Sequence, residues 1–236
     1  MSKTKKTDQG AEDLGLLENA EKLTDQLIEV ETFFEKNKKL LGTIGIAIAA
    51  VIAGVAFYVN YMQGQEEEAQ QEMYQAIYYF EADSLNKALK GDGSNSGFEA
   101  IMDDYSGTKA ANLSKFYAGA ILLKQDKFQE AADLLSKFSA NDILIQARAY
   151  ALTGDAYMEL NDLDEAISYY KKSSDHYPNK YYTPVYLMKL GLALELKKDF
   201  EGALKVYSTI TEKYTDASEF NEAQKAKGRV EQLLEQ

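Results

Sequence analysis

The sequence contains no cysteine, a single histidine and only two prolines. Without cysteine the chain forms neither disulfides nor thiolate metal sites, and it cannot carry the lipidated N-terminal cysteine of bacterial lipoproteins. The lone histidine, His176, leaves little material for histidine-based catalysis. Two prolines among 236 residues interrupt few helices, so the composition suits a mostly helical chain.

Basic residues are fewer than acidic residues. The chain has 26 Lys and Arg against 38 Asp and Glu, a formal net charge of −12. Binding to nucleic acid needs a surplus of basic residues, so we expect no nucleic-acid partner. The sequence shows no nucleophile elbow, phosphate-binding loop or paired metal-ligand motif. We therefore expect a protein that is not an enzyme, with no catalytic residues, no metal and no cofactor.

One segment, residues 40–59, is apolar over 20 residues without a charge. At about 1.5 Å per residue a helix of this length spans roughly 30 Å, the thickness of the hydrocarbon core of a bilayer. Tyr58 and Tyr61 stand at its end, where aromatic rings favour the membrane interface. A cleaved signal peptide has a shorter apolar core and a much shorter leader. The sequence therefore predicts an uncleaved transmembrane signal anchor over residues 40–61.

The charges around this segment predict its orientation. Three lysines precede it and three glutamates follow it: Lys36, Lys38, Lys39, Glu66, Glu67 and Glu68. Positive residues stay on the cytoplasmic side, so we expect residues 1–39 to be a cytoplasmic leader and residues 62–236 to lie outside the cytoplasm. In a bacterium this gives a single-pass inner-membrane protein with a periplasmic domain. An anchor in a eukaryotic organelle would place the domain elsewhere, and the charges alone do not decide between these.

Two patterns indicate contacts of the N-terminal part. Gly45, Ala49 and Ala53 recur every four residues within the apolar segment. Small residues on one face favour close docking of a second membrane helix, although Gly and Ala are common in membrane helices in any case.

The spacing of apolar residues in the leader predicts an amphipathic helix, which either packs on a partner or remains an exposed stalk. Its apolar residues are Leu16, Leu17, Leu23, Leu27, Val30 and Phe34.

The rest of the chain contains three similar stretches, at distances of 35 and then 37 residues. Each has a glycine, a large residue 9 positions later, an alanine after 12 and a large residue after 16. The members are Gly119, Phe128, Ala131 and Leu135; Gly154, Leu163, Ala166 and Tyr170; and Gly191, Phe200, Ala203 and Tyr207. Glycine and alanine permit two antiparallel helices to cross closely, and the large residues fill the space beside the crossing.

This pattern resembles the tetratricopeptide repeat (TPR) family, and Tyr150, Tyr157, Ser173 and Pro178 of the middle stretch also follow its loose consensus. The sequence thus predicts an all-α chain, with one transmembrane helix followed by a TPR-type α-solenoid. The expected parts are a divergent first pair at 66–105, repeats at about 111–140, 147–178 and 183–214, and a capping helix at 218–235. We expect partners to bind the groove lined by the first helices of the repeats, near Asn112, Lys115, Tyr150, Tyr157, Tyr186 and Lys189.

The whole layout resembles the YfgM-like family of bacterial inner-membrane proteins, and residues 105–123 look like that family's entry into its first clear repeat. The resemblance implies an ancillary subunit of the SecYEG translocon. Such a subunit acts with a membrane-anchored periplasmic chaperone related to PpiD and contacts membrane lipid, and nascent secreted proteins are a further candidate partner. The alternative is a structural subunit of envelope, outer-membrane-assembly or cell-division machinery, in which the repeats serve as a spacer.

Overall fold

The computed structural model describes residues 9–235, and the side chains of residue 28 and of residues 31–235. Every regular element in this part of the chain is an α-helix, which confirms the all-α prediction. The chain divides into two compact units, residues 1–61 and 62–236. The longest helix, α1 (Gln9–Glu81), contributes residues to both units.

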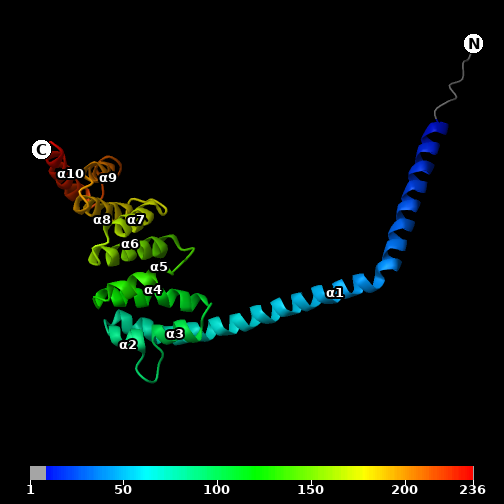
Figure 1. Ribbon diagram of the computed structural model, residues 1–236, viewed down its shortest axis with the longest axis horizontal. Helices are drawn as coiled ribbons and strands as arrows, with labels where there is room; N and C mark the ends of the chain where they lie inside the picture. Colours follow the sequence, from blue (N-terminus) through cyan, green and yellow to red (C-terminus); the bar gives the residue numbers. More distant parts are fainter. Residues whose placement is uncertain (1–8, 236) are drawn as a thin grey trace, which may run out of the picture. The chain divides into compact units, whose positions relative to one another are not determined.

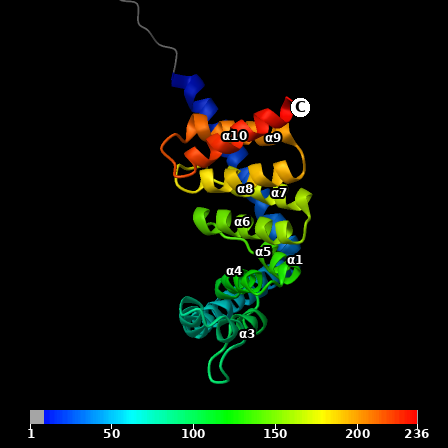
Figure 2. The same cartoon turned by 90° about the vertical axis from the view of Figure 1, so that its left-hand side faces the viewer.

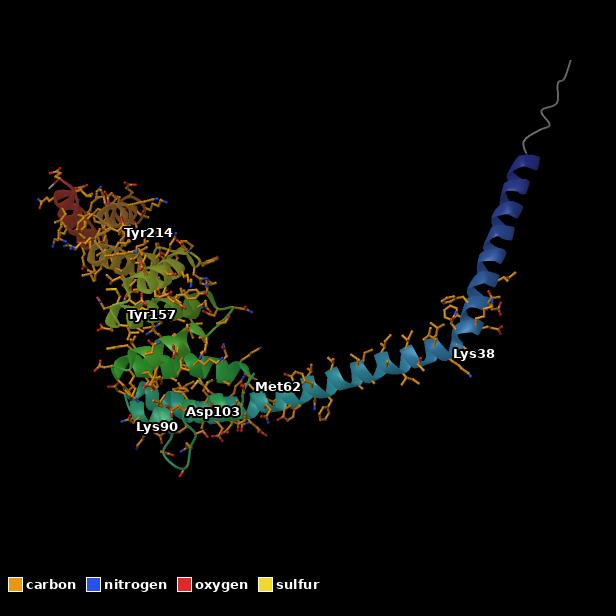
Figure 3. The ribbon with its side chains drawn as sticks, viewed as in Figure 1. Lys38, Met62, Lys90, Asp103, Tyr157 and Tyr214 are labelled. Atoms are coloured by element: carbon orange, nitrogen blue, oxygen red, sulfur yellow. The ribbon has the colours of Figure 1, made fainter. Side chains whose placement is uncertain are left out.

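The first unit contains the apolar segment. Its window of highest mean hydropathy, 2.4, has no buried residue, and by length and composition the helix could cross a membrane. Large apolar side chains such as Ile46 and Phe57 are exposed, and Figure 3 shows side chains extending on both sides of α1 in this view, between the labelled Lys38 and Met62. Of the predicted leader stripe, Phe34 is exposed, whereas the side chains of Leu16, Leu17, Leu23, Leu27 and Val30 lie outside the described residues.

The second unit is a stack of helices in chain order. Figures 1 and 2 both show α4 to α10 following one another along it, and each of these helices contacts the next. The helices after α1 are α2 (Leu85–Lys90), α3 (Phe98–Asp104), α4 (Lys109–Lys124), α5 (Phe128–Ser136), α6 (Ile143–Glu159), α7 (Leu163–Asp175), α8 (Thr183–Leu196), α9 (Phe200–Lys213) and α10 (Phe220–Leu234).

The glycine of each repeat lies where its two helices cross. A Cβ added to Gly119 would be 2.6 Å from Cγ of Leu135, one on Gly154 would be 2.6 Å from Cε1 of Tyr170, and one on Gly191 would be 2.4 Å from Cε1 of Tyr207. The alanines of the pattern, Ala131, Ala166 and Ala203, are completely buried. The small residues therefore set the distance between the helices of each pair, as the spacing predicts.

The same turn joins the helices of all three pairs. Asp126, Asn161 and Lys198, each seven positions after the glycine, have positive φ. In each case the next amide bonds to the carbonyl five residues earlier, at 2.9 Å. This is the helix-ending arrangement in which one left-handed residue allows the chain to reverse.

The first helix pair of the second unit, which we call its first layer, has the same turn and the same spacing of small residues. Asp83 has a φ of 54°, and the amide of Ser84 bonds to the carbonyl of Tyr79. Ala76 and Ala88, both completely buried, have the spacing from Asp83 that Gly119 and Ala131 have from Asp126. Residues 62–81 of α1 and helix α2 thus form a repeat-like pair. A loop at residues 91–97, which projects from the end of the stack in Figures 1 and 2, interrupts the pair's second helix and leads into α3.

Side chains of α1 and α3 connect the first helix pair to α4, the first helix of the next repeat. Oε2 of Glu66, in α1, accepts hydrogen bonds from the backbone amides of Lys109 at 2.5 Å and Ala110 at 3.4 Å. These amides open α4 and have no partner inside the helix, so a carboxylate there satisfies them and suits the positive end of the helix dipole. Phe98 of α3 stacks on Tyr117 of α4 at 5.0 Å between ring centroids.

Candidate functional site

A cavity of about 930 Å³ lies in the second unit, and we call it the α4–α6 groove. It is lined by the end of α1, one side of α4, the α5–α6 loop, the first turns of α6, and the residues at the start of α8. The lining residues that matter most below are Asn112, Leu113, Ala120, Leu144, Arg148 and Tyr186.

The wall on the α4 side is made of packed aromatic rings. Tyr117 contacts Phe80 of α1 at 5.1 Å between centroids, and Phe116 contacts Phe138 of the α5–α6 loop at 5.5 Å. Phe116 is buried, whereas Leu144 on the opposite side is 47% exposed. The groove is therefore a preformed apolar surface with free area on its α6 side, as is usual for ligand sites.

Polar side chains hold the α5–α6 loop in place. Asn112 donates from Nδ2 to the carbonyl of Ser139 at 2.7 Å. Oδ1 of Asp142 accepts from the amides of Leu144 and Ile145 at 2.9 and 3.0 Å, which caps α6. Asn112 and Asp142 are thus already engaged within the chain, and they position the edge of the groove.

Arg148 differs from these groups. Its side chain is exposed on α6 and lines the groove, and it forms no ion pair within the described part of the chain. It lies near Tyr186: burial raises the pKa of Tyr186, and the charge of Arg148 acts in the opposite direction. A guanidinium without a carboxylate beside an apolar surface is a group available to an incoming ligand.

We call the contact between one repeat and the next a junction: the α4–α6 groove lies at the first junction, and the second joins α6 and α7 to α8. At the second junction the polar side chains pair with one another. Oδ1 of Asp155, directly after Gly154, accepts from the hydroxyl of Tyr170 at 2.7 Å and from Nζ of Lys189 at 2.6 Å. The residue directly after Gly119 is Ala120, which lines the groove, and Leu135 takes the place of Tyr170. The carboxylate and hydroxyl present at the second junction are therefore both missing at the first.

The structure divides the six residues predicted for partner binding. Asn112 and Tyr186 line the α4–α6 groove. Lys189 is paired with Asp155 at the next junction. Tyr157, labelled in Figure 3, stacks on Tyr169 of α7 at 5.5 Å, and Tyr150 lies 6.4 Å from the same ring. Lys115 is half-buried on α4 and does not line the groove. Only two of the six thus line the α4–α6 groove.

Sequence reasoning missed Arg148, Tyr182 and the α5–α6 loop, all of which line the groove. One signal was available: the chain has only two arginines, Arg148 and Arg229. Arg229 pairs with Glu195, donating from Nη2 to Oε1 at 2.8 Å. Arginine is favoured at protein interfaces, so an arginine in a lysine-rich chain was a candidate from the outset.

Two other predicted features lie outside the groove. Gly45, Ala49 and Ala53 of the apolar segment are exposed, and apart from the adjoining helix backbone no atom of the described structure lies within 4 Å of the position of a Cβ on Gly45. Among the residues that the structure describes, no group of three or more His, Cys, Asp and Glu side chains could hold a metal ion.

Comparison with known proteins agrees with the repeat geometry. Two family models described as tetratricopeptide repeat match the chain, one at residues 118–181 and one at residues 186–217. No curated protein matches the chain. The matched ranges include all three close helix crossings, at Gly119, Gly154 and Gly191. The chain therefore contains tetratricopeptide repeats, a type of repeat that generally forms non-enzymatic scaffolds for protein–protein interaction.

Proposed function

We propose that this chain is a membrane-anchored TPR adaptor of the bacterial inner membrane, placed beside the SecYEG translocon. Its repeats lie in the periplasm, where they tether a chaperone related to PpiD and assist secreted or envelope proteins. The observation that carries the proposal is α1, which continues from an apolar, membrane-length segment into the first layer of the repeats. Ala69, ten residues after the end of the apolar segment, is already completely buried in that layer.

The layout of the chain supports this role. Residues 105–123 resemble the YfgM-like family, and the charges that flank the apolar segment favour a cytoplasmic N-terminus. The α4–α6 groove offers a preformed surface of the kind that an adaptor needs. The membrane helix contributes a second contact, in which Gly45, Ala49 and Ala53 dock against a helix of a membrane partner.

The test is affinity purification of the tagged full-length protein from native membranes in mild detergent, with the recovered proteins quantified by mass spectrometry. Stoichiometric translocon subunits together with a PpiD-like chaperone are expected. Asn112→Ala with Tyr186→Ala should reduce recovery of the chaperone while translocon subunits remain. Recovery of outer-membrane-assembly or cell-division proteins without the translocon would overturn the proposal in favour of a structural subunit of that machinery.

The membrane contact is tested in the same preparation. Gly45→Leu and Ala49→Leu place a bulky side chain on the small face and should reduce recovery of the translocon. Gly54→Leu is the matched control, because nine residues along a helix place it on the opposite side from Gly45. Equal losses from both faces, or no loss from either, would contradict docking at the small face.

A further inference from the structure

We propose that the α4–α6 groove binds an extended segment of a protein partner that carries an apolar side chain and a nearby Asp or Glu, whose carboxylate pairs with Arg148. The inference rests on the adaptor function proposed above and names the chemistry of the bound segment. It follows from three features of the groove. These are its exposed apolar area, the unpaired guanidinium of Arg148, and the absence of a carboxylate like that of Asp155 at the second junction.

The apolar area needs an apolar occupant. Leu144 and Tyr182 are each 47% exposed, and both line the groove together with the buried Phe116. Exposed apolar surface gathered in a concavity is stabilised when another apolar group covers it. The volume of about 930 Å³ accommodates several side chains, so a stretch of chain fits better than a single small molecule.

The unpaired guanidinium of Arg148 favours a carboxylate on that occupant. Arg148 forms no ion pair in the described part of the chain, and the ammonium of Lys109, at the α4 end of the groove, likewise has no carboxylate partner there. Asp142 also lines the groove, but its Oδ1 accepts the two amides that open α6. Glu81, the other carboxylate of the lining, forms no ion pair with Arg148. A bidentate Arg–carboxylate pair is the strongest contact that Arg148 can form with a peptide.

At the second junction the chain itself supplies a carboxylate that pairs with a cation. There Asp155 is 25% exposed and holds both Lys189 and Tyr170. At the first junction Ala120 leaves the equivalent position without a carboxylate, and the groove is open. Lys189 lies two residues before Gly191, and the residue two positions before Gly154 is Leu152, so the cation of the second junction has no counterpart at the first either. Arg148 lies about one helical turn before Leu152 on α6, and we infer that a carboxylate of the partner pairs with it. Because the chain as a whole carries −12, this attraction acts at short range and does not steer association from a distance.

The test uses two random decapeptide libraries against the full-length protein in lipid nanodiscs. In the first, each decapeptide is enclosed between carrier domains and so offers only side-chain carboxylates. In the second, the decapeptide has a free C-terminus. We expect the first library to yield binders with Leu, Ile or Phe within four residues of Asp or Glu. Changing that acidic residue to Asn or Gln should weaken a selected peptide roughly 10-fold or more, the scale of one charge-assisted contact.

Variants locate the contact. Arg148→Gln should remove the preference for the acidic residue, Arg148→Lys should restore part of it, and the exposed Lys171→Gln, outside the groove, should leave it unchanged. Circular dichroism with thermal unfolding confirms that each variant folds. The inference is overturned if neither library is enriched over empty nanodiscs, if only the free C-terminus library is enriched, or if the acidic preference survives in Arg148→Gln. None of these outcomes depends on the translocon, so the assay and the co-purification can fail independently.

Discussion

The hydroxyl of Tyr170 donates to Oδ1 of Asp155 at 2.7 Å, across the same crossing at which Gly154 permits the close approach of α6 and α7. The next repeat has the same arrangement, with Tyr207 donating to Oε1 of Glu195 at 2.7 Å. Each carboxylate also holds a cation of a following helix, Lys189 in α8 or Arg229 in α10. In each case one acidic side chain thus joins the two helices of a repeat to a later helix of the stack.

The first prediction concerns this hydrogen bond. Tyr170→Phe keeps the ring against Gly154 and removes only the hydroxyl, so it should lower the free energy of unfolding by about 1–2 kcal/mol, as for a bond to a partly buried carboxylate. Denaturant unfolding of the full-length protein in micelles measures it. Tyr181→Phe is the control, because Tyr181 is 70% exposed and its hydroxyl forms no hydrogen bond in the described structure. Equal stability of the two variants would show that the Tyr170–Asp155 bond contributes nothing.

The second prediction is a dependence on pH at Glu195. Burial alone would raise the pKa of this carboxyl, but hydrogen bonds from Arg229 and Tyr207 outweigh it and lower the pKa below its ordinary 4.5. A carboxyl with a lowered pKa stabilises the fold above its unfolded pKa, and this stabilisation is lost as pH falls through the folded value. Glu195→Gln should therefore be less stable than the native protein at pH 7, and the difference should shrink below about pH 4.5.

Thermal unfolding between pH 7 and pH 3 measures this difference. Asp216→Asn, at an exposed carboxyl in the turn after α9 that forms no ion pair in the described structure, is the control and should change stability little at any pH. A gap between Glu195→Gln and the native protein that stays constant over the whole range would contradict the assignment.

The helix crossings could be predicted from the sequence because residue size at fixed spacing encodes them. Gly154 and Ala166 permit two helices to cross closely, and Tyr170 fills the space beside the crossing. The structure shows this packing between α6 and α7. The first layer was harder to recognise in detail. Ala76 replaces the glycine, and the position of Tyr170 corresponds to Asp92, in the loop that interrupts the second helix.

The groove could not be predicted to the same extent. Its wall combines residues from α1, α4, the α5–α6 loop, α6 and the start of α8, and their distances depend on how successive repeats are rotated. Lys189 illustrates the problem: the sequence places it on a first helix of a repeat, but its ammonium is held by Asp155. Only the packed structure distinguishes it from Arg148, which lacks a carboxylate among the described residues.

The third prediction concerns the glycine at the crossing. Gly154→Ala places a methyl group 2.6 Å from Cε1 of Tyr170, so the ring or the helix must shift, and we expect a loss of about 1–3 kcal/mol. Gly228→Ala in α10 is a matched control, because its Cβ would have no atom within 4 Å other than those of the adjoining helix backbone. There alanine should stabilise the helix by about 0.5–1 kcal/mol. Opposite signs in urea unfolding are expected, and stabilisation by both substitutions would show that Gly154 is not required for packing.

The fourth prediction concerns Glu66, which caps α4 from α1. Glu66→Ala leaves the amides of Lys109 and Ala110 without this acceptor and should cost about 1 kcal/mol. Hydrogen exchange should accelerate at these two amides more than at the middle of α4. Glu67→Ala removes an exposed neighbouring charge that forms no hydrogen bond in the described structure, and it should leave both amides protected. Similar exchange in the two variants would contradict the capping role.

The last prediction concerns the orientation of the chain in the membrane. Because the natural sequence has no cysteine, each introduced cysteine is unique, and its reaction with a membrane-impermeant maleimide reports which side it occupies. With the lysines before the apolar segment held in the cytoplasm, Ser94→Cys in the exposed loop of the repeats should react in intact spheroplasts. Ser2→Cys should react only after the membrane is permeabilised. The reverse pattern would place the repeats in the cytoplasm and exclude a periplasmic chaperone as their partner. Reaction of both cysteines in sealed spheroplasts would show that the apolar helix does not span the membrane.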